Sequence, residues 1–227
     1  MKGFIFITAV VVSIALGQAA CHAPGARGTA IEARPALVQP GPPGTPSHVI
    51  SVEKATDLSK VQATKADVEF MQGMIHHHLQ AIDMTNLLAG NTQSDDMQKL
   101  GLRMSLSQAD EIKMMRRWLE VRGQDAPDDH ANHMPGAPMM PGMLSAEEMA
   151  QLAAAKGREF DVLFLRGMIK HHRGALVMVD DLFKTEGAGQ QSEIFAFATD
   201  VEADQRADID RMTAMLAERK RDSAQPQ

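Results

Sequence analysis

Residues 67–84 read DVEFMQGMIHHHLQAIDM, and residues 161–178 read DVLFLRGMIKHHRGALVM. The two segments are identical at ten of eighteen aligned positions, and each contains a pair of adjacent histidines at the same place. A second, weaker repeat follows each copy, because residues 106–119 and 203–216 share Gln, Ile, Met and Leu at matched positions. The body of the chain therefore consists of two copies of one unit.

The spacing of apolar residues predicts that each unit is a pair of helices. At about 100° per residue, the apolar side chains of the first segment fall on one broad stripe: Phe70, Met71, Met74, Ala81, Ile82, Met84 and Leu88. We expect helices over residues 67–90, 95–121, 145–187 and 191–219. Short connections within each half make neighbouring helices antiparallel. The predicted fold is all-α, a four-helix bundle built from two repeated helix–helix units.

Local signals mark the ends of these helices. Gly90 or Asn91 ends the first helix, and Gly123 follows the second. Ser145 and Glu148 have the spacing of a capping box, which predicts the start of the third helix. The bundle domain is expected to cover residues 56–220.

Each copy of the repeat directs two histidines toward the apolar stripe. His77 and His78 fall on the apolar side of the first helix, whereas His76 falls on the opposite side. The second copy keeps the inward pair as His171 and His172, and has a lysine at the outward position. Other inward polar residues recur in both halves: Asp67 and Asp161, Gln108 and Gln205, Glu111 and Asp208.

Burial of such groups is costly unless they are paired or bound to something, and two explanations remain open. A His–carboxylate hydrogen-bond network would fix the register of the bundle. Alternatively, the histidines bind a metal ion together with methionines placed three or four residues away, as Met74 is relative to His77 and His78. The candidate metal ligands are Met74, His77, His78, Glu111, Met115, Met168, His171, His172, Asp208 and Met212.

The residue types at these positions favour copper, and Cu(I) in particular, because thioethers are soft ligands and the chain contains 17 methionines. Another transition metal remains possible. Di-iron bundles use a Glu-x-x-His motif on two helices. Here the residues three positions before His77 and His171 are Met74 and Met168, so an iron oxidase fits poorly.

The proline-rich connection between the halves, residues 125–144, is a second candidate for copper capture, at the surface. Its candidate ligands are His130, His133, Met134, Met139, Met140 and Met143. The same stretch also fits a linker whose methionines only anchor it to the bundle.

The N-terminal residues indicate export. Lys2 and an apolar run over residues 4–16 predict a signal peptide, residues 1–20. Cys21, the only cysteine, is placed like a lipoprotein acceptor, although cleavage after Ala19 is the alternative. Residues 21–55 are rich in Pro and Gly and are expected to form a flexible tether. The protein is predicted to reach the cell envelope or periplasm, lipid-anchored or as a soluble secreted protein.

The composition excludes some other classes. A net charge of −6 with no dominant basic patch argues against a nucleic-acid partner. Hydrophobic residues make up 44% of the chain and charged residues 23%, which is typical of a soluble globular protein. No nucleophile–base pair or cofactor motif supports catalysis.

The paired histidine segments, each followed by a segment with matched Gln, acidic, Ile and Met residues, resemble the family called domain of unknown function 305. The resemblance covers about residues 60–218. It implies a ferritin-like four-helix bundle that is usually exported, is often associated with copper resistance and in some members binds copper. The family motif matches Met74, His77, His78, Met84, Gln108, Glu111 and Met115, and then Met168, His171, His172, Met178, Gln205, Asp208 and Met212. The chain departs from the family pattern at His76 and Lys170, where a proline is usual.

These observations predict an exported copper-binding protein that acts in envelope metal buffering, handover or resistance. Its partners would be the metal ion and envelope copper-handling proteins. The alternatives are a metal-dependent oxidase and a metal-free envelope scaffold whose histidines are structural.

Overall fold

The computed structural model describes residues 36–39, 46–56, 62–130, 136 and 138–224. The chain forms two compact units, residues 1–57 and 58–227. The predicted signal peptide and Cys21 lie outside the described residues.

The described part of the first unit contains short secondary structure where a tether was expected. β1 (Leu37–Gln39) pairs antiparallel with β2 (His48–Ile50), with Leu37 opposite Ile50. The short helix α1 (Val52–Thr56) follows, and the Ser51 hydroxyl accepts a hydrogen bond from the Lys54 N–H at 3.2 Å.

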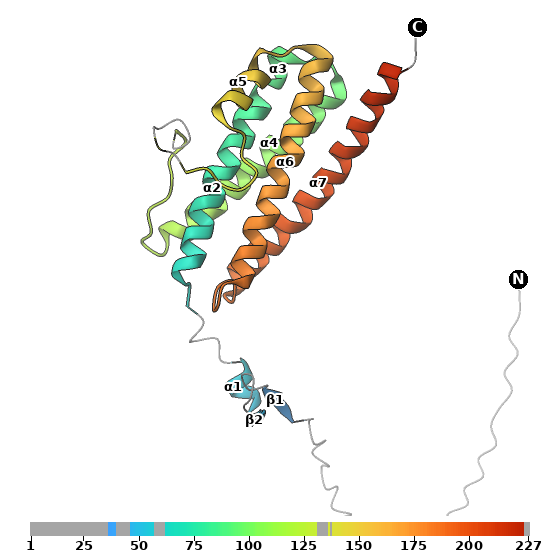
Figure 1. The fold of residues 1–227 in the computed structure, drawn as a ribbon. Coiled ribbons are helices and arrows are strands. Elements are labelled where there is room, and N and C mark those ends of the chain that lie inside the picture. Colours follow the sequence, from blue (N-terminus) through green and yellow to red (C-terminus); the bar gives the residue numbers. More distant parts are fainter. Residues whose placement is uncertain (1–35, 40–45, 57–61, 131–135, 137, 225–227) are drawn as a thin grey trace, which may run out of the picture. The chain divides into compact units, whose positions relative to one another are not determined.

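The second unit is all-α, which confirms the predicted fold class. Its helices are α2 (Lys65–Asn86), α3 (Leu88–Asn91), α4 (Asp95–Glu120), α5 (Ala146–Ala154), α6 (Gly157–Lys184) and α7 (Ser192–Ala224). The four long helices α2, α4, α6 and α7 run alongside one another, and α3 and α5 lie at one end (Figure 1). No helix of the described residues has the length and apolarity of a membrane span.

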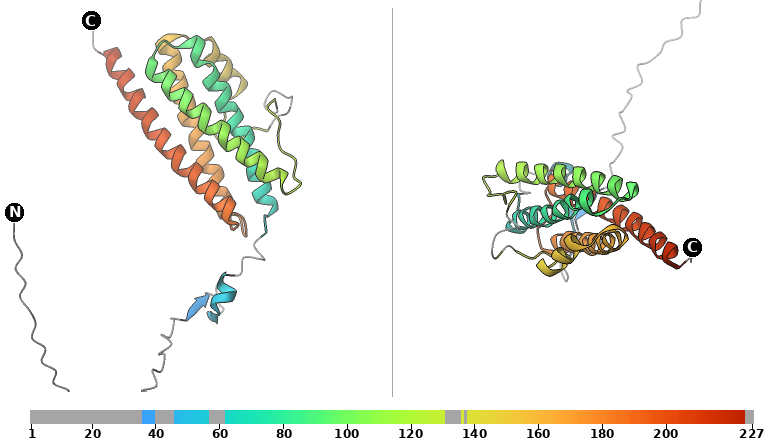
Figure 2. Two further views of the ribbon diagram at one scale, coloured as in Figure 1. Left: turned by 180° about the vertical axis from the view of Figure 1, so that it is seen from behind. Right: turned by 90° about the horizontal axis from the view of Figure 1, so that it is seen from above.

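The long helices pack as two pairs. α2 packs against α4, α6 packs against α7, and the two pairs meet through α2 and α6. Over their described lengths α4 and α7 make very few close backbone contacts. Figures 1 and 2 show α7 leaning away from the other helices toward its C-terminal end. The bundle is therefore closely packed on three sides and looser between α4 and α7.

Capping boxes begin two of the helices. At α5 the Ser145 hydroxyl accepts from the Glu148 N–H at 3.2 Å, and the Glu148 carboxylate accepts from the Ser145 N–H at 2.8 Å. This pair was predicted. The same arrangement at α2 joins Thr64 to Asp67, whose other carboxylate oxygen accepts from the Gly189 N–H at 2.7 Å. Asp67 is thus buried, as expected, but it caps α2 and holds the α6–α7 turn.

The predicted third helix, residues 145–187, is wrong in one respect, because the structure divides it into α5 and α6. Ala155 and Lys156 are extended between them. The Asn91 side-chain amide donates to the carbonyls of Ala153 and Ala155, each at 3.0 Å. Asn91 therefore satisfies carbonyls that a continuous helix would have bonded internally.

The apolar core forms two clusters, and a set of buried polar residues lies between them. One cluster includes Phe70, Met74, Met115 and Trp118, and the other includes Met84, Phe164, Met168 and Met212. We call the intervening set the polar layer: His77, His78, Gln108, Glu111, His171, His172, Gln205 and Asp208. On α4, α6 and α7 these residues fall between the residues of the two clusters, and on α2 they lie close to the boundary.

Residues 138–145, which we call the strap, cross the bundle beside the polar layer. The Gln80 amide donates to the Leu144 carbonyl at 2.9 Å and accepts from the Leu144 N–H at 2.7 Å. The strap lies directly on α6 at Gly174, where a Cβ atom would stand 1.8 Å from the Pro141 carbonyl oxygen. Gly142 has φ +78°, a conformation that favours glycine. These contacts hold the strap against α2 and α6.

We predict that Gly174→Ala destabilises the protein by about 1–3 kcal/mol, because the new methyl group would displace the strap backbone. The matched control is Gly90→Ala, since no atom lies within 4 Å of the position of the added Cβ. Urea denaturation should show the control to be neutral or slightly more stable. Equal stability of the two variants would contradict the described path of the strap.

Candidate metal centre

The repeat places one histidine of each pair at the α2–α6 interface. His77 from α2 and His171 from α6 have ring centroids 3.7 Å apart, with an angle of 35° between the ring planes. Both side chains are fully buried. Adjacent residues on a helix point about 100° apart, so the second histidine of each pair faces elsewhere.

The second histidines face carboxylates on the partner helices. His78 Nε2 lies 2.6 Å from Glu111 Oε2, between α2 and α4. His172 Nε2 lies 3.6 Å from Asp208 Oδ2, between α6 and α7, which is longer than a hydrogen bond. Asp208 is one methylene shorter than Glu111, and its other oxygen is held by Arg103 at 2.7 Å. The two halves are therefore similar but not equivalent.

The hydrogen bonds of the central pair define their tautomers. His77 Nε2 lies 3.0 Å from the Pro141 carbonyl oxygen, and His171 Nε2 lies 2.9 Å from the His77 carbonyl oxygen. A carbonyl oxygen only accepts, so Nε2 carries the proton in both rings. In a neutral ring the other nitrogen, Nδ1, then has a free lone pair. Neither Nδ1 has a hydrogen-bond partner among the described residues.

Burial keeps these rings neutral. It lowers the pKa of His77 to about 3, with a further contribution from the nearby His78. Burial likewise lowers the pKa of His171 well below its ordinary value, and it lowers the pKa of His172 despite the opposing effect of Asp208. Neutral imidazole is the form that binds metal ions.

The two carboxylates of the layer keep their charge. Burial raises the pKa of Glu111, but the hydrogen bonds from His78 and Ser107 outweigh it, and the net direction is downward. Burial also raises the pKa of Asp208, and His172 and Arg103 together bring it below the ordinary value. The layer thus combines neutral imidazoles with carboxylates.

Buried thioethers lie on both sides of the polar layer. Met74 and Met115 belong to one apolar cluster, Met168 and Met212 belong to the other, and all four side chains are fully buried. Met74 and Met168 lie one helical turn before the histidine pairs. Soft donors are therefore available near the imidazoles.

The ten predicted ligands do not form one preformed site. The structure brings together His77 with His171, His78 with Glu111, and His172 with Asp208. Within the described ranges no three His, Cys, Asp or Glu side chains converge as a metal cluster. Binding of a metal ion by these groups would need thioether ligands or a local rearrangement of side chains.

The predicted surface ligands of the connection are dispersed. His130 and Met139 are exposed, and Met140 is half-buried against Gly73. Met143 is not a surface residue, because only 6% of it is exposed and its sulfur accepts a hydrogen bond from the Met140 N–H at 3.2 Å. His133 and Met134 lie outside the described residues.

Several residues that shape the centre were not identified from the sequence. Gln80 holds the strap over the layer, Arg103 binds Asp208, and Ser107 donates to Glu111 at 3.1 Å. Ser107 lies one turn from Glu111, so helical spacing could have indicated it. Gln80 and Arg103 act on residues that are distant in sequence, which no local pattern reveals. Asp161 is buried as predicted, but it accepts from Arg219 at 3.0 Å and takes no part in the centre.

Fold and centre together define a class of protein: an all-α bundle of two repeated helix pairs with adjacent buried histidines in each half. The chain belongs to the family Domain of unknown function (DUF305), whose model matches residues 67–216. The resemblance found in the repeated histidine segments is thereby confirmed.

Solved structures of the family share the fold. A DUF305 fragment from Deinococcus radiodurans is 30% identical and has a TM-score of 0.59, and the match covers 69% of this chain and 98% of that one. A DUF305 protein from Streptomyces coelicolor is 26% identical with a TM-score of 0.59, over 68% and 94% of the two chains. No curated protein sequence matches the chain significantly.

A third similar structure is CopM in its Cu(I)-bound form. It is 28% identical with a TM-score of 0.52, and the match covers 69% of this chain and 98% of CopM. CopM is also known in Cu(II)-bound, Ag-bound and apo forms.

We predict that the metal-free protein loses stability as the pH falls from about 6.5 toward 3. An unfolded histidine has a pKa of about 6.5, whereas that of folded His77 is about 3. Between these values the unfolded chain binds more protons, so the free energy of unfolding decreases with falling pH. The measurement is urea denaturation across this range.

Replacing the central pair tests the origin of this slope. His77→Leu/His171→Leu should flatten the pH dependence, and His130→Ala in the exposed connection should leave it unchanged. If all three proteins have the same slope, the buried rings are not responsible for it.

Proposed function

We propose that this chain is an exported copper-binding protein that holds Cu(I) in the bundle interior, for buffering or handover in the cell envelope. The observation that carries the proposal is the pair of buried, neutral imidazoles, His77 and His171, whose Nδ1 lone pairs have no partner among the described residues. The predicted signal peptide supports export, and lipid anchoring through Cys21 is part of the proposal.

Unpaired polar atoms in the layer favour a bound ligand over a purely structural network. Each such atom costs about 1–3 kcal/mol when it is buried without a partner. A structural network would satisfy its members, yet among the described residues only His78 and Glu111 are joined by a hydrogen bond between two side chains of the layer. The atoms without partners in the described structure are Nδ1 of all four histidines, His172 Nε2, and Oε1 of Gln108 and Gln205. A metal ion would offset part of this cost by accepting the nitrogen lone pairs.

The donor set supports Cu(I) as the ion. Imidazole alone suits several transition metals, but thioethers shift the preference toward soft ions such as Cu(I). Met74 and Met168 are buried one turn from the histidines. The similar protein CopM has Cu(I)-bound and Ag-bound forms, and Ag(I) prefers the same soft donors. These likenesses support the proposal for this chain.

The proposal is tested by Cu(I) competition with a chromophoric chelator under reducing conditions. We expect tight binding by residues 50–227 and a loss of affinity of at least about tenfold in His77→Ala/His171→Ala, because two ligands are removed. The matched control is His76→Ala/Lys170→Ala, at the equivalent outward positions of the two repeats, and it should bind normally.

A variant of the connection separates the alternative sites. If Met139→Ala/Met140→Ala abolishes binding while the histidine variant retains it, copper is held at the surface and the buried histidines are structural. If the unaltered protein binds none of Cu(I), Cu(II) or Zn(II), the metal-binding function is wrong and a scaffold role replaces it.

A further inference from the structure

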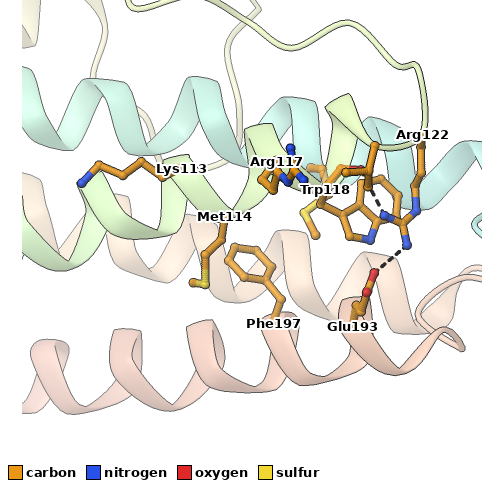
Figure 3. Close-up of a pocket in the computed structure, with 9 residues that line it drawn as sticks. Lys113, Met114, Arg117, Trp118, Arg122, Glu193 and Phe197 are labelled. Atoms are coloured by element: carbon orange, nitrogen blue, oxygen red, sulfur yellow. Dashed lines mark hydrogen bonds and ion pairs between the residues drawn. The ribbon is translucent and has the colours of Figure 1, made fainter.

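A cleft of about 510 Å³ opens where α4 and α7 are loosely packed, away from the central histidines. Its interior is apolar, with Met71, Trp118 and Phe197 each less than a tenth exposed. Figure 3 shows Met114 and Trp118 extending from α4, and Phe197 from α7, into the space between the two helices. A volume of about 300–1,000 Å³ is the usual size of small-molecule sites.

The indole N–H of Trp118 is an unused donor in this cleft. The Trp118 side chain is 6% exposed, and its Nε1 has no acceptor among the described residues. In Figure 3 the indole nitrogen lies on the ring edge that faces α7. Indole only donates hydrogen bonds, so a buried indole N–H needs an acceptor oxygen. The cleft lies beside the ring, and a small shift of the side chains that cover Nε1 would let a ligand in the cleft supply one.

The residues that line the cleft carry more positive than negative charge. Lys113, Arg117 and Arg122 line it, with Glu193 as the one acidic lining residue. Arg122 is already engaged, since its guanidinium lies 4.1 Å from the centroid of the Trp118 ring and 2.5 Å from Glu193.

Arg117 remains available to a ligand. Its side chain is 72% exposed, and its ion pair with Glu120 at 3.1 Å is a surface pair within one helical turn. Such pairs are weak and are readily exchanged for another anion. Lys113 extends along α4 away from Trp118 in Figure 3 and pairs with Asp110 at 2.8 Å, so it adds little net charge to the cleft.

We propose that the α4–α7 cleft binds a small amphipathic carboxylate. The apolar body lies against Met71, Met114 and Phe197. A carboxylate oxygen accepts the hydrogen bond of the Trp118 indole, and Arg117 balances the negative charge. Met114 and Val121 at the rim are more than half exposed and would be covered by the ligand. The site is separate from the polar layer and does not depend on copper.

The fluorescence of Trp118 can be used to detect binding in the cleft. Trp118 is the only tryptophan and the chain has no tyrosine, so intrinsic fluorescence reports on this cleft alone. The metal-free protein is titrated with decanoate at monomeric concentrations, and with decyltrimethylammonium, which has the same tail and the opposite charge. We expect a saturable change in Trp118 emission with decanoate, and binding of the cation weaker by about tenfold or more.

Two substitutions on the exposed face of α4 test the assignment without disturbing the core. Arg117→Gln should weaken decanoate binding by about tenfold, and Met114→Glu should abolish it by placing a carboxylate at the rim. Arg211→Gln is the matched control, because this exposed arginine lies fourteen residues beyond Phe197, about 21 Å along α7.

Three outcomes would overturn the proposal. The first is the absence of saturable binding up to millimolar decanoate. The second is equal binding of the anion and the cation, or equal affinity in all three variants, which would indicate an unspecific apolar surface. The third is a fluorescence change that depends on protein concentration and accompanies dimerisation, which would identify a second copy of the chain as the occupant.

Discussion

Four buried imidazoles in the middle of a helical bundle are the constraint on which the rest of the structure depends. Burial suppresses the charge of His77 and His171, and two backbone carbonyls accept hydrogen bonds from their Nε2–H groups. The Nδ1 lone pairs of these rings then remain as donors for a metal ion. Apolar clusters on both sides exclude water from this layer and supply thioethers. A bundle with leucine at these positions would be easier to fold, but it would have no donors for a metal ion.

The repeat explains why the centre has two similar halves, and differences between the halves make the centre asymmetric. Glu111 reaches His78 directly, whereas Asp208 is shorter and is held partly by Arg103. The two central histidines also differ in their hydrogen-bond acceptors. His77 donates to the Pro141 carbonyl in the strap, whereas His171 donates to the His77 carbonyl in α2. This geometry therefore does not favour two equivalent metal sites. The looser packing of α4 and α7 adds a further asymmetry, and it leaves the cleft at Trp118 open.

Most of the bundle could be predicted from the sequence, because apolar and histidine residues recur at helical spacing and in two copies. The repeat and the helical spacing placed His77, His78, His171 and His172 inside, and the structure agrees. Contacts between residues far apart in sequence were not predictable in this way. Asn91 binds carbonyls some sixty residues away, at the point where the predicted third helix divides. Gln80 binds Leu144 and so holds the strap, with Met143, against the core. Neither residue breaks the local pattern, so no spacing rule identifies its role.

In the proposed function, buried imidazoles together with thioethers hold copper inside the bundle. X-ray absorption spectroscopy at the copper edge of the Cu(I)-loaded protein tests it most directly, because nitrogen and sulfur ligands are distinguished by distance. We expect copper ligands that include imidazole nitrogen as well as sulfur, with the multiple-scattering signature of histidine rings. A shell of sulfur alone would contradict it, since the copper would then be bound by methionines without the buried histidines.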